Sequence, residues 1–268
     1  MQETRPLALV VGAAGGIGRA TAEALLGRGF DVLAADRDAA RLKTLERFGI
    51  ETVLLDMTDR GRVAALARRL AEEGRTLKAL VVTAAVHSTH PAADLVDDVI
   101  DSVIDANLVS HVKLVRDMLP LVGEGGIIVG VSSIAACVGV PMSSMYSASK
   151  RGLEGFYESL HAEMTIRGIR VSIIQPGNVN TGFNETGNTW SPSGDSPADR
   201  IYASVVSRID SRYGMSPLKV AAVIARVVLL RRPRFCYVVG WNARKAHWAL
   251  RLLGRDAALR LMAGFFGF

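Results

Sequence analysis

The chain contains few of the residues that mark secreted, metal-binding or membrane-spanning proteins. Its 268 residues include only two cysteines, Cys137 and Cys236, which lie far apart in the sequence. Such a pair gives neither a disulfide framework nor the close spacing of a metal site, so we predict no bound metal and a reducing compartment, the cytoplasm. No apolar run reaches the length of about 18 residues that a membrane-spanning helix needs. No charged-then-apolar leader precedes the first strand.

Apolar residues are plentiful, and they occur in short runs. Hydrophobic residues make up 49% of the chain and charged residues 22%, the balance of an ordinary globular protein. The runs alternate with helical patterns, which predicts an α/β fold with one doubly wound parallel sheet of about seven strands. We expect residues 1–240 to form this single domain and residues 241–268 to be a tail that belongs to it. The expected strands are Leu7–Val11, Asp31–Asp36, Glu51–Met57, Leu77–Ala85, Gly126–Ser133, Arg170–Gln175 and Phe235–Gly240.

A glycine-rich segment joins the first strand to a helix. It reads Gly12-Ala-Ala-Gly-Gly16-Ile-Gly18. Glycines permit a tight turn and a close approach by a ligand, and the free N–H groups at a helix start stabilise a pyrophosphate. The segment therefore predicts a dinucleotide site. A glycine-rich loop without a ligand is the alternative, but the strand before it and the helix after it argue against that interpretation.

The second strand ends in a carboxylate, Asp36, followed by Arg37. An acid about 20 residues beyond the glycine turn can accept hydrogen bonds from an adenosine ribose, and it would repel a 2′-phosphate. Arg37 could instead hold that phosphate. Because no basic residue stands within the glycine turn, we favour NAD over NADP. The alternative role for Asp36 is a helix N-cap, which Asp38 could also provide.

The most informative stretch runs from Gly126 to Lys150. An apolar, β-branched strand ends in two hydroxyls, the second of which is Ser133, and a helix begins near Tyr146. Tyr146 and Lys150 stand four residues apart, which places both side chains on one helix face. We expect the ammonium group to lower the pKa of the phenol from its usual value of about 10. Tyr146 could then exchange a proton with an alcohol oxygen held by Ser133. The alternative is an ordinary solvated helix face, but the glycine turn and Asp36 favour chemistry.

Taken together, these motifs resemble the short-chain dehydrogenase/reductase family. The match runs in order from about Leu7 to Thr181, and it includes Asn107 and the segment Pro176-Gly177-Asn-Val-Asn-Thr181. The resemblance implies a Rossmann-type fold, a nicotinamide dinucleotide cofactor and reversible hydride transfer between a secondary alcohol and a ketone.

The resemblance also implies a role for each matching residue. Tyr146 would be the general acid/base, Lys150 would bind the nicotinamide ribose, Ser133 would orient the substrate oxygen and Asn107 would hold a relay water. Asp56 and Met57 would line the adenine pocket, and Val179 and Thr181 would reach the nicotinamide carboxamide. The full set of implied cofactor contacts is Gly12, Gly16, Ile17, Gly18, Asp36, Arg37, Asp56, Met57, Ala84, Tyr146, Lys150, Pro176, Gly177, Val179 and Thr181.

The fourth strand departs from the family pattern. It reads Val82-Thr83-Ala84-Ala85 where the family has Asn-Asn-Ala-Gly. We expect Thr83 to replace one side-chain hydrogen bond to the neighbouring turn. The methyl group of Ala85 should cause a local adjustment without loss of cofactor binding. His87 follows this strand and could face the pocket, but we favour a loop histidine without a catalytic role.

Several residues suggest an apolar substrate. Cys137, Met142 and Met145 lie between Ser133 and Tyr146, and soft apolar groups there suit an apolar alcohol such as a steroid, a terpenoid or an aryl carbinol. After Thr181 the composition changes to a polar, glycine-rich segment with Trp190 in its middle. We interpret residues 182–216 as a substrate lid, with an inconsequential surface loop as the alternative.

The tail carries the chain's positive charge. From Arg226 to Phe268 there are nine Lys and Arg against one acid, Asp256, so this segment has a net charge of +8 while the whole chain has +6. Apolar residues at helical steps predict an amphipathic helix, broken near Gly254. We favour packing as ordinary core. The alternatives are a cover over the substrate pocket or a neighbouring subunit, and weak contact with an anionic membrane surface. Nucleic-acid binding is not favoured, because no recognition motif accompanies the charge. The helical steps involve Trp248, Leu252, Leu259, Met262 and Phe266.

The sequence therefore predicts an NAD(H)-dependent oxidoreductase. The alternatives are an NADP(H)-dependent ketone reductase and a dinucleotide sensor without catalysis. By analogy with the family we expect a homodimer or homotetramer, with the helices Leu95–Leu119 and Tyr146–Arg167 at the interface.

Overall fold

The computed structural model describes residues 5–183, 187–194, 196–209 and 214–268. Its centre is a seven-stranded sheet in the order β3-β2-β1-β4-β6-β7-β9, and all its neighbouring strands are parallel. This confirms the predicted doubly wound sheet. The strands are β1 (Leu7–Val11), β2 (Asp31–Asp36), β3 (Glu51–Leu54), β4 (Leu77–Val82), β6 (Val122–Val131), β7 (Arg170–Pro176) and β9 (Cys236–Val239).

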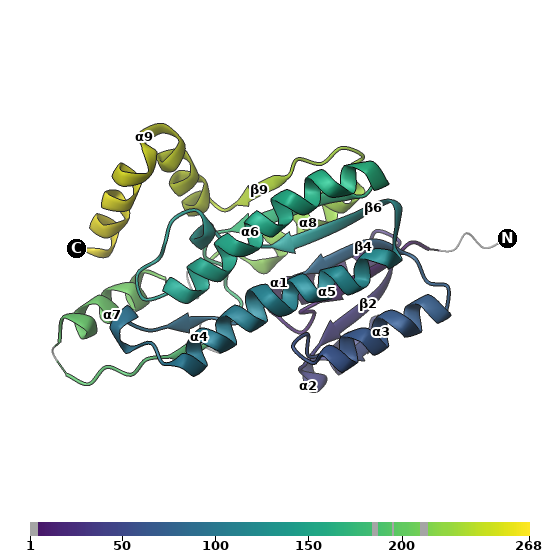
Figure 1. Ribbon diagram of the computed structural model, residues 1–268, viewed down its shortest axis with the longest axis horizontal. Helices are drawn as coiled ribbons and strands as arrows, with labels where there is room; N and C mark the ends of the chain where they lie inside the picture. The colour runs from purple at the N-terminus through teal and green to yellow at the C-terminus, as the bar shows by residue number, and fades with distance from the viewer. Residues whose placement is uncertain (1–4, 184–186, 195, 210–213) are drawn as a thin grey trace.

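Helices cover both faces of the sheet (Figure 1). Within β1, Leu7 and Leu9 face one side and Ala8 and Val10 face the other, because successive side chains of a strand alternate. One face packs against α3 (Arg60–Glu72), α5 (Ser110–Met118) and α6 (Ser144–Met164). The other face packs against α1 (Gly16–Leu26), α2 (Ala39–Glu46) and α8 (Pro217–Leu229). Both faces are buried, as the continuous apolar strands require.

The helix predicted from Leu95 to Leu119 is interrupted. It consists of α4 (Asp97–Ile104), a π-helical turn (Asp105–Val109) and α5, and Asn107 lies in the π turn. Such wide turns within a helix often occur at functional sites. The predicted long helix is confirmed over the contiguous α4, π turn and α5, but apolar periodicity did not reveal the π turn.

The third and fourth strands end earlier than predicted. Beyond β3, the carboxylate of Asp56 accepts hydrogen bonds from the backbone N–H and the hydroxyl of Thr58, which turns the chain out of the sheet. Beyond β4, the N–H groups of Thr83 and Ala84 both donate to the carbonyl of Val11, so the regular ladder stops.

A small substructure with its own core lies beyond the carboxyl ends of the strands. It contains α7 (Pro197–Arg208) and a two-residue parallel pairing of β5 (Ser88–Thr89) with β8 (Asn188–Thr189). Its core consists of three buried side chains with partly buried neighbours around them. The three are Met142, Val205 and Phe266. Parts of the predicted lid, residues 184–186, 195 and 210–213, lie outside the described residues.

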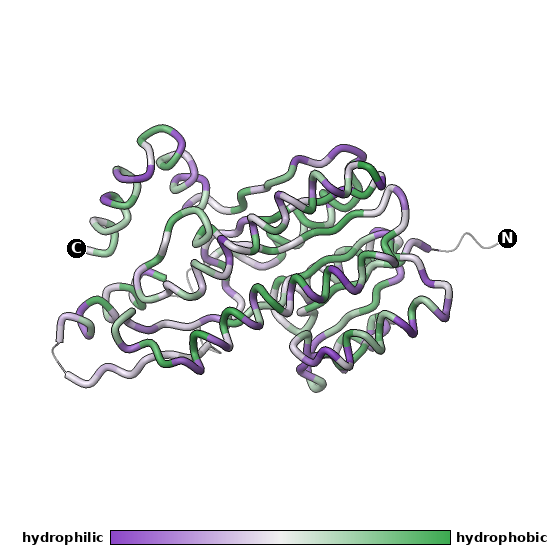
Figure 2. The backbone as a smooth tube through the Cα atoms, viewed as in Figure 1, coloured by the Kyte–Doolittle hydropathy of each residue, from purple (hydrophilic) through white to green (hydrophobic). Residues whose placement is uncertain are grey.

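The tail forms α9 (Trp241–Phe266), which bends sharply at Gly254, where φ is 77° and ψ is 172°. The predicted helix with a break at Gly254 is confirmed. The prediction that the tail packs as ordinary core was wrong, because only Ala243, Ala258 and Phe266 of this helix are buried. Figure 2 shows that apolar and polar residues are mixed along it. No helix among the described residues has the length and apolar content needed to cross a membrane.

Candidate active site

The main cavity opens at the carboxyl ends of the central strands. It has a volume of about 490 Å³ and is lined by the glycine turn, by the ends of β2, β6 and β7, and by the start of α6. Ligands of open parallel sheets bind at this edge. The predicted site residues that line it are Gly12, Gly16, Ile17, Gly18, Asp36, Arg37, Ser133, Tyr146, Lys150, Pro176, Gly177, Val179 and Thr181.

The glycine turn leaves no room for a side chain at Gly12 or Gly18. Gly12 has a φ of +88°, and a Cβ atom on Gly18 would lie 2.0 Å from the carbonyl oxygen of Gly12. No side chain caps α1, and its first turn carries no acidic residue. The N–H groups of this first turn therefore face the cavity and can donate to an anion. This cradle fits the pyrophosphate of a dinucleotide.

The carboxylate of Asp36 is fixed beside the turn. One oxygen accepts the N–H of Ala14 at 2.9 Å and the other accepts the N–H of Asp38 at 3.0 Å. The alternative N-cap role for Asp36 was wrong, because Asp38 caps α2. Arg37 is exposed at the rim of the cavity, and Arg41 lines it as well.

A smaller cavity of about 150 Å³ adjoins Asp36 and the glycine turn. Asp56 and Met57, the two predicted adenine contacts, line it together with Ala84, another predicted cofactor contact. The N-cap of α3 is Asp59, whose carboxylate accepts the N–H of Arg62. Adenine binding at this place stays a prediction.

Three successive residues at the end of β6 face three side chains of α6 that stand one turn apart. The hydroxyl of Ser133 lies close enough to the phenol of Tyr146 to act on its pKa. The ammonium group of Lys150 donates to the carbonyl of Val131 at 2.9 Å. Between these two, Ser132 donates its hydroxyl to the carboxylate of Glu154, which stands one helical turn beyond Lys150. The structure thus brings the three predicted side chains to one cavity wall.

The electrostatics differ from the prediction for Tyr146. Burial raises its pKa to about 12, while the Ser133 hydroxyl acts in the opposite direction. The ammonium nitrogen of Lys150 lies 5.8 Å from the centroid of the phenol ring. Burial also lowers the pKa of Lys150 to about 8. The expected fall in the pKa of Tyr146 was therefore wrong for this structure, because the loss of hydration outweighs the attraction of the cation.

Sequence reasoning missed Glu154, which stands four residues after Lys150. Its carboxylate accepts the hydroxyl of Ser132 at 2.5 Å and the amide of Gln175 at 2.7 Å. Desolvation raises the pKa of Glu154, and its charge raises the pKa of Lys150 against the effect of burial. The spacing Tyr146, Lys150, Glu154 was visible in the sequence as one helix face. Its partner Ser132 was visible only as a hydroxyl at the strand end.

Asn107 lies behind this wall and lines neither cavity. Its carboxamide oxygen accepts the N–H of Val86 at 2.7 Å, and its nitrogen donates to the carbonyl of Val86 at 2.8 Å and to Ser149 at 3.2 Å. Its relay-water role stays a prediction. Thr83 donates to the carbonyls of Val11 and Gly12 at 3.0 and 3.1 Å, which confirms its expected replacement bond.

His87 lies in the loop before β5, as expected, and its side chain lines the cavity; its lack of a catalytic role stays a prediction. Its ring centroid lies 5.0 Å from that of Tyr146 and 5.9 Å from that of Phe183. A ring nitrogen contacts the hydroxyl of Ser143 at 3.3 Å. Burial lowers the pKa of His87 to about 4, so the ring is neutral near pH 7. Tyr146 therefore lies in a wall of aromatic rings. This could not be predicted, because the rings come from residues far apart in the sequence.

The four predicted substrate residues do not line the main cavity. The thiol of Cys137 accepts a hydrogen bond from Gln175 at 3.3 Å. Met142 is buried in the small core, and Trp190 packs against that core. Met145 is half-buried. Proximity in sequence to Tyr146 was a poor guide for Met142, because the loop between β6 and α6 places it in the small core. Substrate contact by any of them stays a prediction.

Residues 6–192 match the family model of the short chain dehydrogenases. This chain belongs to the short-chain dehydrogenase family. The family acts on alcohols and ketones with a nicotinamide cofactor, so the chain is an oxidoreductase.

The names of two relatives refer to a ketodihydrosphingosine and to a hydroxysteroid. A 3-ketodihydrosphingosine reductase of Bacteroides thetaiotaomicron is 28% identical over 87% of this chain and 87% of its own. The human 17-beta-hydroxysteroid dehydrogenase type 1 is 34% identical over 68% of this chain and 59% of its own. Among solved structures, a short-chain dehydrogenase from Streptomyces avermitilis has a TM-score of 0.81 and 28% identity, covering 98% of this chain and 96% of its own.

Short-chain dehydrogenases bind NAD or NADP. The family membership and the glycine cradle together establish a nicotinamide dinucleotide as the cofactor class.

Proposed function

We propose that this short-chain dehydrogenase is an NAD(H)-dependent enzyme that reversibly oxidises an apolar secondary alcohol to a ketone. One observation supports this most strongly. The side chains of Ser133, Tyr146 and Lys150 lie together on one wall of a cavity that the glycine cradle also lines, and the Ser133 hydroxyl is close enough to lower the pKa of the phenol.

The chain's own residues supply position and proton transfer, while the cofactor, when bound, supplies the hydride acceptor. Tyr146 takes the proton of the alcohol during oxidation and returns it during reduction. Ser133 holds the substrate oxygen beside the phenol. Lys150, fixed by the carbonyl of Val131, places its charge near the phenol, where it favours the phenolate that forms during the reaction.

The preference for NAD rests on Asp36. Its carboxylate is held by two backbone N–H groups at the cavity edge. There it can accept a hydrogen bond from a ribose hydroxyl and repel a 2′-phosphate. The specific alternative is NADP, because Arg37 and Arg41 line the same cavity and could pair with that phosphate.

The apolar substrate class is supported by the wall around Tyr146. Val140, Phe183 and Ile209 line the cavity beside His87. Such a surface suits a steroid, a terpenoid or an aryl carbinol. The sphingoid ketone and the steroid in the names of two relatives belong to the same apolar class. We also propose that residues 182–216 act as a lid and that α4, α5 and α6 form the interface of a homodimer or homotetramer.

A substrate panel tests the proposal. Purified protein is mixed with apolar alcohols and with NAD or NADP separately, and NADH absorbance is recorded. Tyr146→Phe should reduce turnover by a factor of about 10² to 10⁴ while NADH binding persists. Tyr157→Phe is the matched control, because this buried phenol bonds His111 at 2.9 Å on another part of α6. Unchanged turnover in Tyr146→Phe would refute the assignment, and equal rates with both cofactors would refute the role of Asp36.

A further inference from the structure

The helix α9 exposes an apolar stripe. Eight of the sixteen large hydrophobic side chains that the described residues expose lie between Trp241 and Phe268. In the first half of α9, Trp241, Trp248 and Leu252 are 69%, 56% and 71% exposed. Their spacing of seven and then four residues places them on one helix face. Ala243, which is buried, lies on the opposite face. The stripe therefore points away from the domain.

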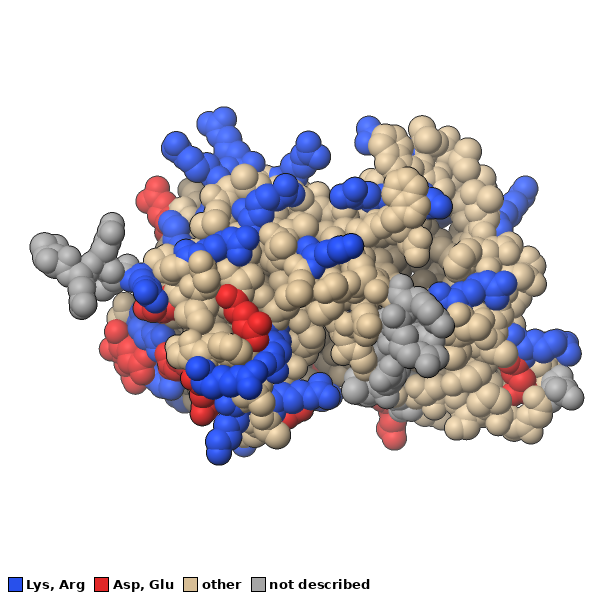
Figure 3. Space-filling view, turned by 180° about the vertical axis from the view of Figure 1, so that it is seen from behind, with Lys and Arg blue, Asp and Glu red and all other residues tan. Residues whose placement is uncertain are grey.

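Basic residues border the stripe on both sides. Arg244 and Arg251 lie along one edge by helical spacing and Lys245 along the other, and all three are exposed. The ammonium group of Lys245 lies 5.2 Å from the ring centroid of Trp241. Figure 3 shows, at the upper right where the tail lies, a mainly uncharged surface with Lys and Arg side chains among it. A tryptophan-containing apolar centre with a cationic border is typical of helices that lie in a membrane interface.

The positive charge beside the stripe favours an anionic lipid surface over a second copy of the chain as the partner. A second copy packed on this stripe by twofold symmetry would bring two cationic borders together, which is unfavourable. An anionic lipid surface offers negative headgroups to the border and an apolar layer to the tryptophans. We propose that α9 docks on an anionic lipid surface through Trp241, Trp248 and Leu252.

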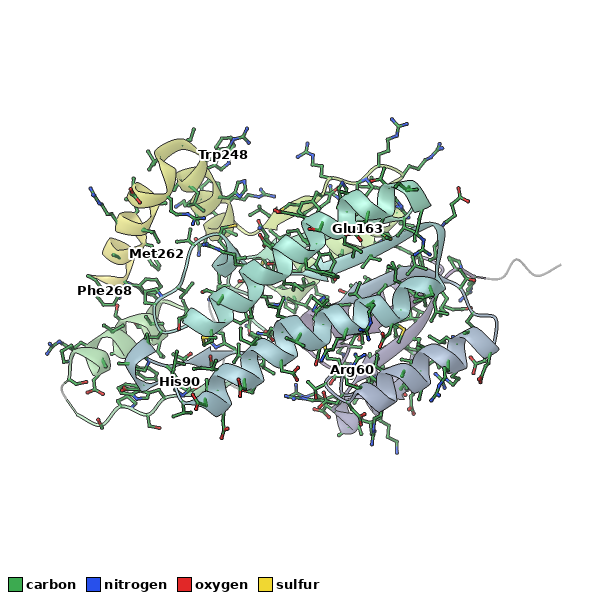
Figure 4. The ribbon with its side chains drawn as sticks, in the orientation of Figure 1. Arg60, His90, Glu163, Trp248, Met262 and Phe268 are labelled. Carbon is green, nitrogen blue, oxygen red and sulfur yellow. The ribbon has the colours of Figure 1, made fainter. Side chains whose placement is uncertain are left out.

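Docking through α9 would also fix the position of the main cavity relative to the lipid surface. The second half of the helix is attached to α7, because the hydroxyl of Ser204 donates to the carbonyl of Phe266, and Phe266 is buried in the small core. Val140 and Ile209 pack against that core and also line the main cavity. Figure 4 shows Trp248 near the bend of α9 and Phe268 at its other end, beside α7. If the proposed function holds, an apolar alcohol would reach the cavity from the lipid.

Vesicle flotation tests the docking. The full-length protein should bind vesicles of phosphatidylcholine with about 30% phosphatidylglycerol, and binding should fall steeply in about 0.5 M salt. The variant Trp248→Ser/Leu252→Ser and the variant Arg244→Glu/Arg251→Glu should each reduce partitioning at least about 10-fold. The matched control, Leu54→Ser/Ile166→Ser, removes exposed apolar side chains of other elements and should bind like the parent.

Equal binding to pure phosphatidylcholine, or no binding to either vesicle, would overturn the proposal. Sedimentation of the same variants identifies the main competitor. If the parent is an oligomer that Trp248→Ser/Leu252→Ser dissociates, the stripe covers a second copy and lipid docking is refuted. Cofactor binding without vesicles is measured in parallel, and it should be unchanged in every variant. Failure of the docking is therefore distinguishable from failure of the proposed function.

Discussion

The central sheet and the small substructure around α7 have hydrophobic cores of very different size. The sheet is packed on both faces by extensive clusters in which many side chains are fully buried. The lid helix α7 and the end of α9 share a core with three buried side chains. Tyr146 and Lys150 belong to the first region, while the apolar rim of the cavity belongs partly to the second. The chain therefore holds its proton-transfer groups on a rigid frame and its substrate rim on a part of low local stability.

The largest expected effect compares the two cores directly. Leu80 and Val205 are both fully buried, the first in β4 and the second in α7. Leu80→Ala should lower the free energy of global unfolding by about 3 kcal/mol. Val205→Ala should lower it by less than about 1 kcal/mol, because the small core can open without the sheet. Denaturant unfolding measures both.

Hydrogen exchange sharpens the same comparison. Val205→Ala should speed exchange in α7 and the end of α9, and leave that of β4 unchanged. Equal losses of unfolding free energy in both variants would show that the two cores form one cooperative unit.

A second prediction concerns acid stability of the frame. Burial, aided by the charge of Lys150, lowers the pKa of His111 to about 3. The folded state therefore binds fewer protons than the unfolded state below pH 6.5. The stability from neutral His111 is fully present above pH 6.5 and is lost as the pH falls toward 3. Between pH 7 and pH 5 the loss should be about 2 kcal/mol.

The variant His111→Gln tests this prediction. Gln keeps an acceptor for the hydroxyl of Tyr157 but does not titrate. Its unfolding free energy should fall between pH 7 and pH 5 by about 2 kcal/mol less than that of the parent. A parallel decline of both proteins would contradict the assignment to His111.

A third prediction concerns the electrostatic support of Lys150. The charge of Glu154 raises the pKa of Lys150, which burial lowers to about 8. Glu154→Gln removes this support, so Lys150 should lose its proton at a lower pH. The alkaline limb of the pH profile of kcat/KM should move toward neutral pH by roughly half a unit or more.

The control for this prediction is Glu163→Gln. Glu163 is exposed near the other end of α6, as Figure 4 shows. Its replacement should leave the profile unchanged. If both variants shift alike, the effect belongs to the general charge of the helix.

The smallest expected effect lies in the tail. Gly254 has backbone angles that essentially only glycine adopts, although nothing lies within 4 Å of a Cβ atom placed on it. Gly254→Ala should cost about 1 kcal/mol locally and favour a straighter helix. Hydrogen exchange of the end of α9 should rise, while global unfolding and cofactor binding stay unchanged. A loss of global stability would show that the tail is part of the main frame.

Sequence reasoning was accurate where local chemistry and repetition determine structure. The apolar runs predicted the parallel sheet, the glycine turn predicted the cradle, and the spacing of Tyr146 and Lys150 predicted their common wall. Gly254 correctly marked the break in the tail. Each of these features depends on residues close in sequence or on a strict period.

The failures concern properties that depend on tertiary surroundings. The pKa of Tyr146 follows the loss of its hydration, which no spacing reveals. The ring of His87 lies against that of Tyr146, a contact between distant segments that no sequence spacing reveals. The methionines near Tyr146 were expected in the pocket, but the loop directs Met142 into the small core. The tail was expected to pack as ordinary core. It is largely exposed because only a few of its side chains find a contact surface on the domain.

The pairing of β5 with β8 has a consequence for turnover. It spans two residues on each side, with one further bond from the N–H of Trp190 to the carbonyl of Thr89 at 2.9 Å. Each such bond contributes only about 1 kcal/mol net. The pairing of β5 with β8 should therefore open many times for each opening of the central sheet. Departure of a product past His87 would then need no disturbance of the groups that handled its proton.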